Sequence, residues 1–176
     1  VLVHDFGNTA RMDSLTNIDG VVYFKVQDVQ TGARALWKSD AEGTAQVHEF
    51  GVVTGESYGG AWQFAGLDGM VYMLLADMSS SLELWRTDGT PDGTFLVSDI
   101  LPGPANSDIG FKVVDGTVYF TASNGAGQRG LWKTNGTPET TILLRDSVAN
   151  GSDWALSRMY HVNGQFYFIA TNPVYG

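Results

Sequence analysis

The chain has 176 residues and a mass of 19.0 kDa, and 43% of its residues are hydrophobic, which suits one domain with a sizeable core and excludes a disordered chain. Its 19 acidic and 10 basic residues give a formal net charge of −9 without any basic cluster, so neither nucleic acid nor an anionic membrane surface is expected as a partner. The absence of cysteine excludes disulfides and thiol chemistry, and no apolar run reaches the roughly 18–20 residues of a membrane-spanning helix, so no membrane insertion is expected.

One motif recurs about every 48 residues: an Asp-Gly or Asn-Gly pair, followed by a short apolar run that contains a tyrosine. The tyrosines are Tyr23, Tyr72, Tyr119 and Tyr167, and the steps between them are 49, 47 and 48 residues. A second motif, Leu-Trp followed by a basic residue, then Ser or Thr, then Asp or Asn, keeps the same period at residues 36–40, 84–88 and 131–135. A period of this size is typical of repeat architectures.

In chain order, residues 1–6 match the last strand of the later copies and are predicted to be an outer strand that completes a neighbouring blade. The repeats are predicted at residues 7–50, 51–100 and 101–147, and a partial repeat at 148–176, all within one repeat domain, 1–176. In the third repeat, turn sequences separate four short β patterns at residues 111–114, 117–123, 129–134 and 141–146. Four antiparallel strands per repeat is the strand number of a propeller blade.

The second strand of each repeat supports this architecture, because it is apolar on both faces. Side chains alternate along a strand, so Val71 and Met73 lie on one face and Tyr72 and Leu74 on the other. A sheet with one solvated face would alternate between apolar and polar residues, whereas a blade is packed between two neighbours. We therefore predict an all-β fold, a β-propeller-like array of four-stranded antiparallel blades.

The ring is predicted to be incomplete. Four Asp-Gly or Asn-Gly hairpins are present but only three Leu-Trp motifs, so the last blade would lack its third strand and leave unpaired edges, which natural proteins avoid. The remaining blades are expected from the same polypeptide or from another chain, with a further Leu-Trp motif after Gly176.

The segment from Glu83 to Gly103 reads Glu-Leu-Trp-Arg-Thr-Asp-Gly-Thr-Pro-Asp-Gly-Thr and continues through Phe-Leu-Val-Ser-Asp-Ile to Pro-Gly. It resembles the repeat unit of the ELWxxDGT (hyalin-like) family of large secreted or surface bacterial proteins. The resemblance covers essentially the whole chain; the first copy departs from it at Ala41-Glu42 and the third at Asn135 and Thr140. It implies an extracellular or cell-surface propeller-like protein and brings no enzyme activity and no catalytic residues.

Two recurrent acidic positions are candidate cation ligands, because Ca²⁺ prefers clustered carboxylates. The first comprises Asp40, Asp88 and Asn135, and the second comprises Asp5, Glu49, Asp99 and Asp146. We favour structural roles for both: Asp and Asn cap their own turns by accepting backbone N–H bonds two residues on, and charged residues protect a peripheral strand. No cofactor is therefore expected, with Ca²⁺ as the alternative.

The recurrent tryptophans, Trp37, Trp85 and Trp132, are predicted to pack between blades rather than to stack on sugars. The aromatics outside the repeat pattern are better ligand candidates, because binding residues concentrate in loops on a rigid scaffold. Trp62 and Trp154, together with Tyr58 and Asp153, lie in Gly-rich connections and are the predicted ligand-binding residues. Local packing is the alternative for each of them.

No catalytic residue and no metal ligand is predicted. His4 and His48 occupy equivalent positions in successive copies and His161 falls in another strand, so the histidines are not expected to share a zinc ion. The favoured function is a non-catalytic extracellular module that binds a glycan or a protein, or that acts as a scaffold. Two alternatives are a structural subunit of a larger assembly and part of an enzyme whose axial active site is completed by blades absent from this chain.

Overall fold

The computed structural model describes residues 4–52, 62–76, 82–99, 110–123, 129–146, 160–163 and 165–167. Within them the only helical element is one turn of 3₁₀ helix, η2 (Pro138–Thr140), and none is long and apolar enough to cross a membrane. The chain divides into two compact units, Val1–Ser79 with Leu84–Leu96 and Ser80–Glu83 with Val97–Gly176, and each is described by itself.

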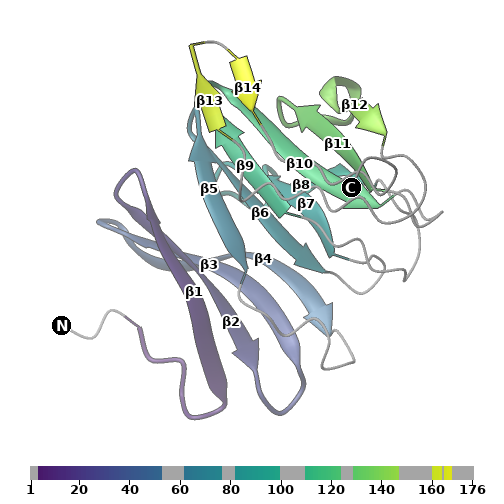
Figure 1. The fold of residues 1–176 in the computed structure, drawn as a ribbon. Coiled ribbons are helices and arrows are strands. Elements are labelled where there is room, and N and C mark those ends of the chain that lie inside the picture. Colours follow the sequence, from purple (N-terminus) through teal and green to yellow (C-terminus); the bar gives the residue numbers. More distant parts are fainter. Residues whose placement is uncertain are drawn as a thin grey trace. The chain divides into compact units, whose positions relative to one another are not determined.

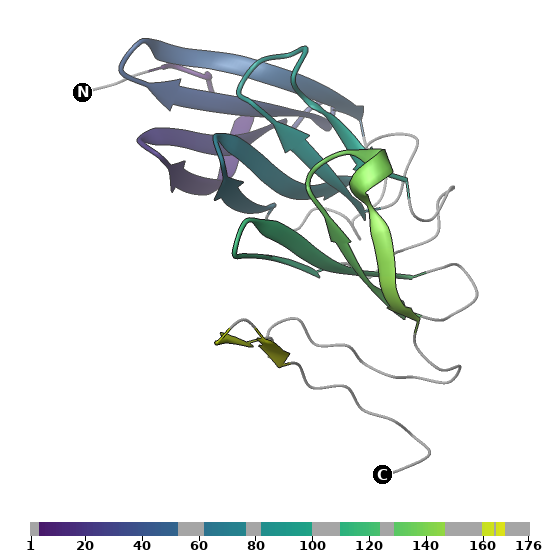
Figure 2. The same cartoon turned by 90° about the horizontal axis from the view of Figure 1, so that it is seen from above.

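The strands form three four-stranded antiparallel sheets and one two-stranded hairpin (Figure 1). The first sheet has the order β1 (Ala10–Ile18), β2 (Val21–Asp28), β3 (Ala33–Asp40), β4 (Gly43–Val52). The second has the order β5 (Gln63–Leu67), β6 (Met70–Ala76), β7 (Leu82–Thr87), β8 (Phe95–Ser98), and the third β9 (Gly110–Val114), β10 (Thr117–Ser123), β11 (Arg129–Thr134), β12 (Ile142–Asp146). The hairpin, yellow in Figure 2, joins β13 (Tyr160–Val162) to β14 (Gln165–Tyr167). The predicted all-β fold with four-stranded repeats is confirmed, and the strands of the third repeat lie within one residue of their expected bounds.

The first two strands of each sheet are joined by the predicted Asp-Gly turn. The φ angles are 52° and 87° at Asp19 and Gly20, 50° and 76° at Asp68 and Gly69, and 44° and 74° at Asp115 and Gly116. Two successive residues with positive φ match the right-handed twist of the flanking strands, and Asp followed by Gly tolerates this geometry better than most pairs. The hairpin prediction is therefore confirmed at all three positions.

The second strand of the second sheet is buried on both faces, as its composition predicts. Val71, Tyr72, Met73, Leu74 and Leu75 are all between 0% and 4% exposed. In the first sheet the run from Tyr23 to Val26 is likewise buried, and it includes the charged Lys25.

A hydrophobic core lies within the first unit, between the first sheet and the part of the second sheet that belongs to this unit. Trp85 of β7 packs edge-on against Phe50 of β4, with ring centroids 5.1 Å apart, and the ring of His48 lies 5.9 Å away. Trp62, immediately before β5, packs edge-on against the other side of Phe50 at 5.2 Å. The outer strand of the first sheet is thus held against the third strand of the second. Core packing is confirmed for Trp85, while Trp37 and Trp132 are half-buried.

The N-terminal segment repeats the same aromatic arrangement on the first sheet. The rings of His4 and Phe6 lie 5.2 and 4.8 Å from that of Trp37, and Phe6 also meets Phe24 at 6.0 Å. His4 and Phe6 stand one repeat before His48 and Phe50 in the sequence. Residues 4–6 are not in a strand, however, so the described part of segment 1–6 supplies the packing of an outer strand without its hydrogen bonds.

Candidate functional site

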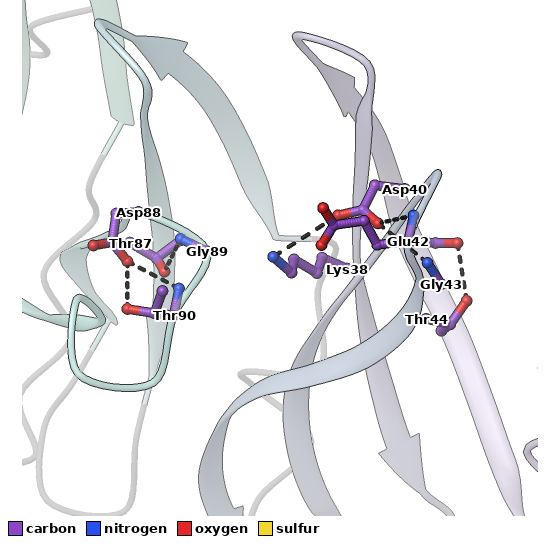
Figure 3. Close-up of polar contacts among 10 residues, drawn as sticks. Lys38, Asp40, Glu42, Gly43, Thr44, Thr87, Asp88, Gly89 and Thr90 are labelled. Carbon is purple, nitrogen blue, oxygen red and sulfur yellow. Dashed lines mark hydrogen bonds and ion pairs between the residues drawn. The ribbon is translucent and has the colours of Figure 1, made fainter.

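A pair of hydroxyls closes the turn between the third and fourth strands in each of the three four-stranded sheets, and in the second sheet this turn carries the Asp88-Gly89-Thr90 motif. The Oγ atoms are 2.9 Å apart for Ser39 and Thr44, 2.6 Å for Thr87 and Thr94, and 2.9 Å for Thr134 and Thr141 (Figure 3 shows the first two turns). Thr87 and Thr134 end the third strands of their sheets, and Thr94 and Thr141 immediately precede the fourth strands. Ser39 and Thr44 are register partners one position inside the ends of β3 and β4. Each pair therefore joins the two strands at or next to the turn.

The aspartates of the first two turns cap them, as predicted. Oδ1 of Asp40 accepts the backbone N–H groups of Glu42 at 2.8 Å and Gly43 at 3.2 Å, and its other oxygen lies 3.8 Å from Nζ of Lys38. Oδ1 of Asp88 accepts the N–H of Thr90 at 2.9 Å and its hydroxyl at 2.7 Å.

These bonds from Thr90 hold the pKa of Asp88 below its ordinary value. Their hydrogen bonds give Asp40 and Asp88 a structural role within their own turns. Within the described ranges, no three His, Asp or Glu side chains lie close enough to hold one ion.

The third turn is closed by threonine instead of aspartate. Oγ1 of Thr140 accepts the N–H groups of Asn135 and Thr137, each at 3.2 Å, and it contacts the Thr137 hydroxyl at 3.2 Å. Thr140 stands where the second turn has Gly93, and a Cβ at Gly93 would clash with the carboxylate of Asp88. The two departures of the third copy are therefore linked: a side chain at this position excludes the aspartate cap and takes over its hydrogen bond.

The glycine of the second turn lies against a tyrosine of the first sheet. A Cβ on Gly89 would meet the hydroxyl of Tyr23 at 2.9 Å and Nζ of Lys38 at 3.6 Å, and Gly89 has a φ of 88°. Burial, with the nearby charges of Asp40 and Asp88, raises the pKa of Tyr23. The Asp-Gly-Thr turn of one sheet therefore also forms part of the contact with the sheet before it.

Charged side chains are buried between the first and second sheets. Lys25 is 1% exposed; its Nζ lies 2.8 Å from Oδ2 of Asp13 and 5.9 Å from the centre of the Trp62 ring. Ser14 has a φ of 62° and lies in an irregularity of β1. Its hydroxyl donates to Oδ1 of Asp13 at 2.8 Å and accepts the backbone N–H of Trp62 at 2.7 Å. A hydrogen-bonded chain thus links β1, β2 and the start of β5.

Arg34 is also buried near this group, and its pKa is lowered by burial, with Asp13 opposing the shift. The repeat motifs did not predict these buried charges. Lys25 occupies the position of Leu74 and Thr121 in the other copies, so the mismatch between copies was the available signal.

An open hollow of about 470 Å³ lies between the first two Asp-Gly hairpins, lined by Asn17, Ile18, Asp19, Gly66, Leu67 and Asp68. Gly66 is required at its floor, because a Cβ there would come within 2.5 Å of Cγ2 of Ile18. The carboxylates of Asp19 and Asp68 are among its lining residues, but two carboxylates at an open hollow do not identify a ligand.

Of the predicted ligand-binding residues, only Trp62 lies in the described part of the chain. It is 5% exposed and belongs to the core with Phe50, so local packing describes its position and it offers no surface to a ligand. From the sequence, Trp62 is assigned to a loop because it follows a Gly-rich connection and stands at a different repeat position from Trp154. Tyr58, Asp153 and Trp154 lie outside the described residues.

The remaining sequence candidates lie apart from one another. The rings of His4 and His48 pack on different tryptophans, Trp37 and Trp85. Asp5, Glu49 and Asp99 are exposed, which agrees with solvated positions at the ends of outer strands. No protein-family model matches this chain, and no curated protein matches its sequence. Membership of the ELWxxDGT family therefore stays a prediction.

Proposed function

We propose that the chain is a β-propeller-like scaffold of the cell surface or extracellular space, whose sheets are blades and whose connections bind a glycan or a protein without catalysis. The observation that carries the proposal is the packing of Trp85 against Phe50 and His48, which joins one four-stranded sheet face to face with the next. All three sheets share one strand order, as stacked blades require. With three Leu-Trp motifs, the chain would supply part of a ring.

The recurrent polar residues favour a scaffold. Asp40 and Asp88 cap turns, the six hydroxyls close them, and Gly89 receives Tyr23. Because these polar side chains form hydrogen bonds within their own turns, they favour a structural role for the repeat.

The connections between sheets are the proposed binding segments, and the strand registers support their place. In the first sheet Asp40 pairs with Gly43 at one end, while Ala33 pairs with Val52 at the other, so the chain leaves β4 at the end opposite the Asp turn. In the third sheet Gly130 pairs with Asp146, and the chain leaves β12 at the corresponding end. The segments that follow hold Tyr58 in one case and Asp153 and Trp154 in the other. Both segments therefore follow strand ends that lie opposite the capped turns, and binding residues often concentrate in segments that connect rigid strands.

A glycan array and a pull-down of surface proteins with the whole chain test this proposal. The paired substitution Tyr58→Ala with Trp154→Ala should lower ligand binding by about tenfold or more, because aromatic side chains dominate such contacts. Tyr167→Ala is the matched control: Tyr167 is 55% exposed and lies on β14, outside both connections, so its loss should leave binding unchanged. Binding that is indifferent to the pair, or equally sensitive to Tyr167→Ala, would refute the assignment of the connections.

A further inference from the structure

Of the three turns between third and fourth strands, the third is the one that begins with an asparagine. Asn135 stands where the second turn has Asp88, and Gly136 follows it as Gly89 follows Asp88. Among the described residues, the Asn135 side chain has no hydrogen-bond partner, because Thr140 closes the turn in its place. Asn135 is exposed, and Asp88 is exposed at the same position, so this exposure belongs to the turn itself.

An asparagine that is followed by glycine can react with its own backbone. The backbone nitrogen of the glycine attacks Cγ of the asparagine and forms an N–Cγ bond, and the side-chain nitrogen leaves as ammonia with the proton of the attacking N–H group. Water then opens the cyclic imide at either carbonyl, which gives aspartate or isoaspartate. Glycine favours the reaction because it has no Cβ to hinder the approach of its nitrogen and its backbone rotates freely.

The hydrogen bonds of the third turn hold its backbone and leave this side chain unused. The N–H of Gly136 donates to Oγ1 of Thr134 at 2.9 Å, so a hydroxyl oxygen already faces the proton that the nitrogen must lose. The N–H groups of Asn135 and Thr137 each donate to Oγ1 of Thr140 at 3.2 Å. The Asn135 amide can therefore turn toward the nitrogen of Gly136 without breaking a hydrogen bond to the described part of the chain.

The second turn is protected at the same position. Oδ1 of Asp88 accepts the N–H of Thr90 at 2.9 Å and its hydroxyl at 2.7 Å, and these bonds lower the pKa of Asp88, so its carboxyl group is ionised at neutral pH. A carboxylate carbon resists attack, because the negative charge of its oxygens repels an incoming electron pair. The neutral amide of Asn135 has neither this charge nor, within the described residues, such bonds.

We propose that Asn135 is a site of spontaneous deamidation in the folded protein, with the backbone nitrogen of Gly136 as the nucleophile. Either product adds a negative charge to the third turn. Isoaspartate also adds one methylene group to the backbone, which shifts Gly136 away from Thr134 and disturbs the hydroxyl pair of Thr134 and Thr141 that closes the turn. This inference goes beyond the proposed function, because the reaction depends on no ligand of the connections.

The test is tryptic peptide mapping of the whole chain after incubation in the folded state at neutral and at mildly alkaline pH. Cleavage after Lys133 and Arg145 releases a peptide in which Asn135 is the only asparagine, so its products are separated from those of the other Asn-Gly pairs. The aspartyl and isoaspartyl forms of this peptide should accumulate with time. They should form faster at the higher pH, because the attacking nitrogen must lose its proton.

Asn17 is the internal control in the same protein. Its Oδ1 accepts the N–H of Gly20 at 3.0 Å, and the next residue is the branched Ile18 instead of glycine. The peptide that contains Asn17 should therefore stay largely unmodified over the time in which the Asn135 peptide reacts.

Two substitutions of Thr140 test whether the turn, and not the Asn-Gly pair alone, sets the reactivity. Thr140→Gly leaves room for the Asn135 side chain to accept the N–H of Thr137. It should slow the reaction by about fivefold, because a hydrogen bond of ordinary strength must then break first. Thr140→Ala keeps a Cβ at this position and provides no such room, so it should react at least as fast as the wild type.

Melting temperatures verify that both variants fold. The inference is overturned if the Asn135 peptide stays unmodified in the folded wild type while the urea-unfolded chain deamidates. It is also overturned if folded Thr140→Gly protein reacts as fast as Thr140→Ala. Where either variant unfolds, the wild type decides by itself, since equal modification at Asn135 and Asn17 would contradict the proposal.

Discussion

The turns of the second and third sheets have the same length and the same hydroxyl pair, yet they are closed by different chemistry. In the second, the carboxylate of Asp88 accepts the N–H of Thr90, and Gly93 leaves room for it. In the third, the hydroxyl of Thr140 accepts the equivalent N–H of Thr137, and Asn135 replaces the aspartate. In both turns the equivalent backbone N–H group is hydrogen-bonded, although the residue that accepts the bond differs.

The largest effect is expected at Gly89, which has two roles: it adopts a positive φ, and it leaves room for the Tyr23 hydroxyl. Gly89→Ala should destabilise the protein by about 1–3 kcal/mol, because φ is 88° and the new Cβ would meet the Tyr23 hydroxyl at 2.9 Å. Gly69→Ala, at a φ of 76° with no atom within 4 Å of the new Cβ, measures the backbone strain alone. Urea unfolding of both variants gives the difference.

The contact with Tyr23 can be isolated further in a Tyr23→Phe background. There the hydroxyl is gone, so Gly89→Ala should cost about as much as Gly69→Ala. An unchanged cost in that background would show that the turn of the second sheet does not depend on the tyrosine of the first.

An intermediate effect is expected when the third turn is transplanted into the second. Gly93→Thr alone should cost about 1–2 kcal/mol, because the new side chain displaces the Asp88 cap. Adding Asp88→Asn should recover part of that loss, since the introduced hydroxyl can then accept the Thr90 N–H as Thr140 does for Thr137. A double variant that is as unstable as the sum of the two single variants would contradict the linkage between these positions.

The smallest expected effect is a difference in the pH dependence of stability between the turn with Asp88 and the turn with Asn135. The pKa of Asp88 lies below its ordinary value of 3.8, so its ionised form favours the fold. This contribution is present above the ordinary pKa and is lost as the pH falls through the lower, folded-state pKa. Asp88→Asn should therefore reduce the fall in melting temperature between pH 6 and pH 3 by about 1–2 °C. The shift is small because the carboxylate is exposed.

Asn135→Ala in the third turn serves as the comparison, because Asn135 carries no charge. Its effect on the melting temperature should be the same at pH 3 and pH 6. An acid limb that is identical in wild type and Asp88→Asn would remove Asp88 from the pH dependence.

Local features of the fold were predictable from the sequence, whereas most contacts between sheets were not; the core packing of Trp85 is the exception. The Asp-Gly hairpins follow from the backbone requirement of two residues, and the strands of the third repeat follow from its turns and β-branched residues. The aspartate caps of Asp40 and Asp88 are equally local. Asn135 was expected to act likewise, but the hydroxyl of Thr140, five residues on, closes that turn.

The environment of Trp62 comes from another sheet and could not be predicted from its own repeat. Trp62 was predicted to be a loop aromatic because it adjoins a Gly-rich connection and does not fall at the repeat position of Trp154, whereas its packing against Phe50 places it in the core. Lys25 would be assigned to solvent on its chemistry alone. The sequence pattern of one repeat does not show which side chains of the neighbouring repeat contact it.

The buried pair of Lys25 and Asp13 has a consequence for the order of the repeats. Lys25 faces the ring of Trp62, whereas the residues equivalent to Trp62 in the other copies, Asp13, Ile109 and Ser157, carry no aromatic ring. A protein rebuilt with the same repeats in another order would bury the ammonium group of Lys25 against a different neighbour in place of the Trp62 ring. Near-identical units are thereby given a fixed succession, and the first repeat can be followed by the second but not exchanged with it.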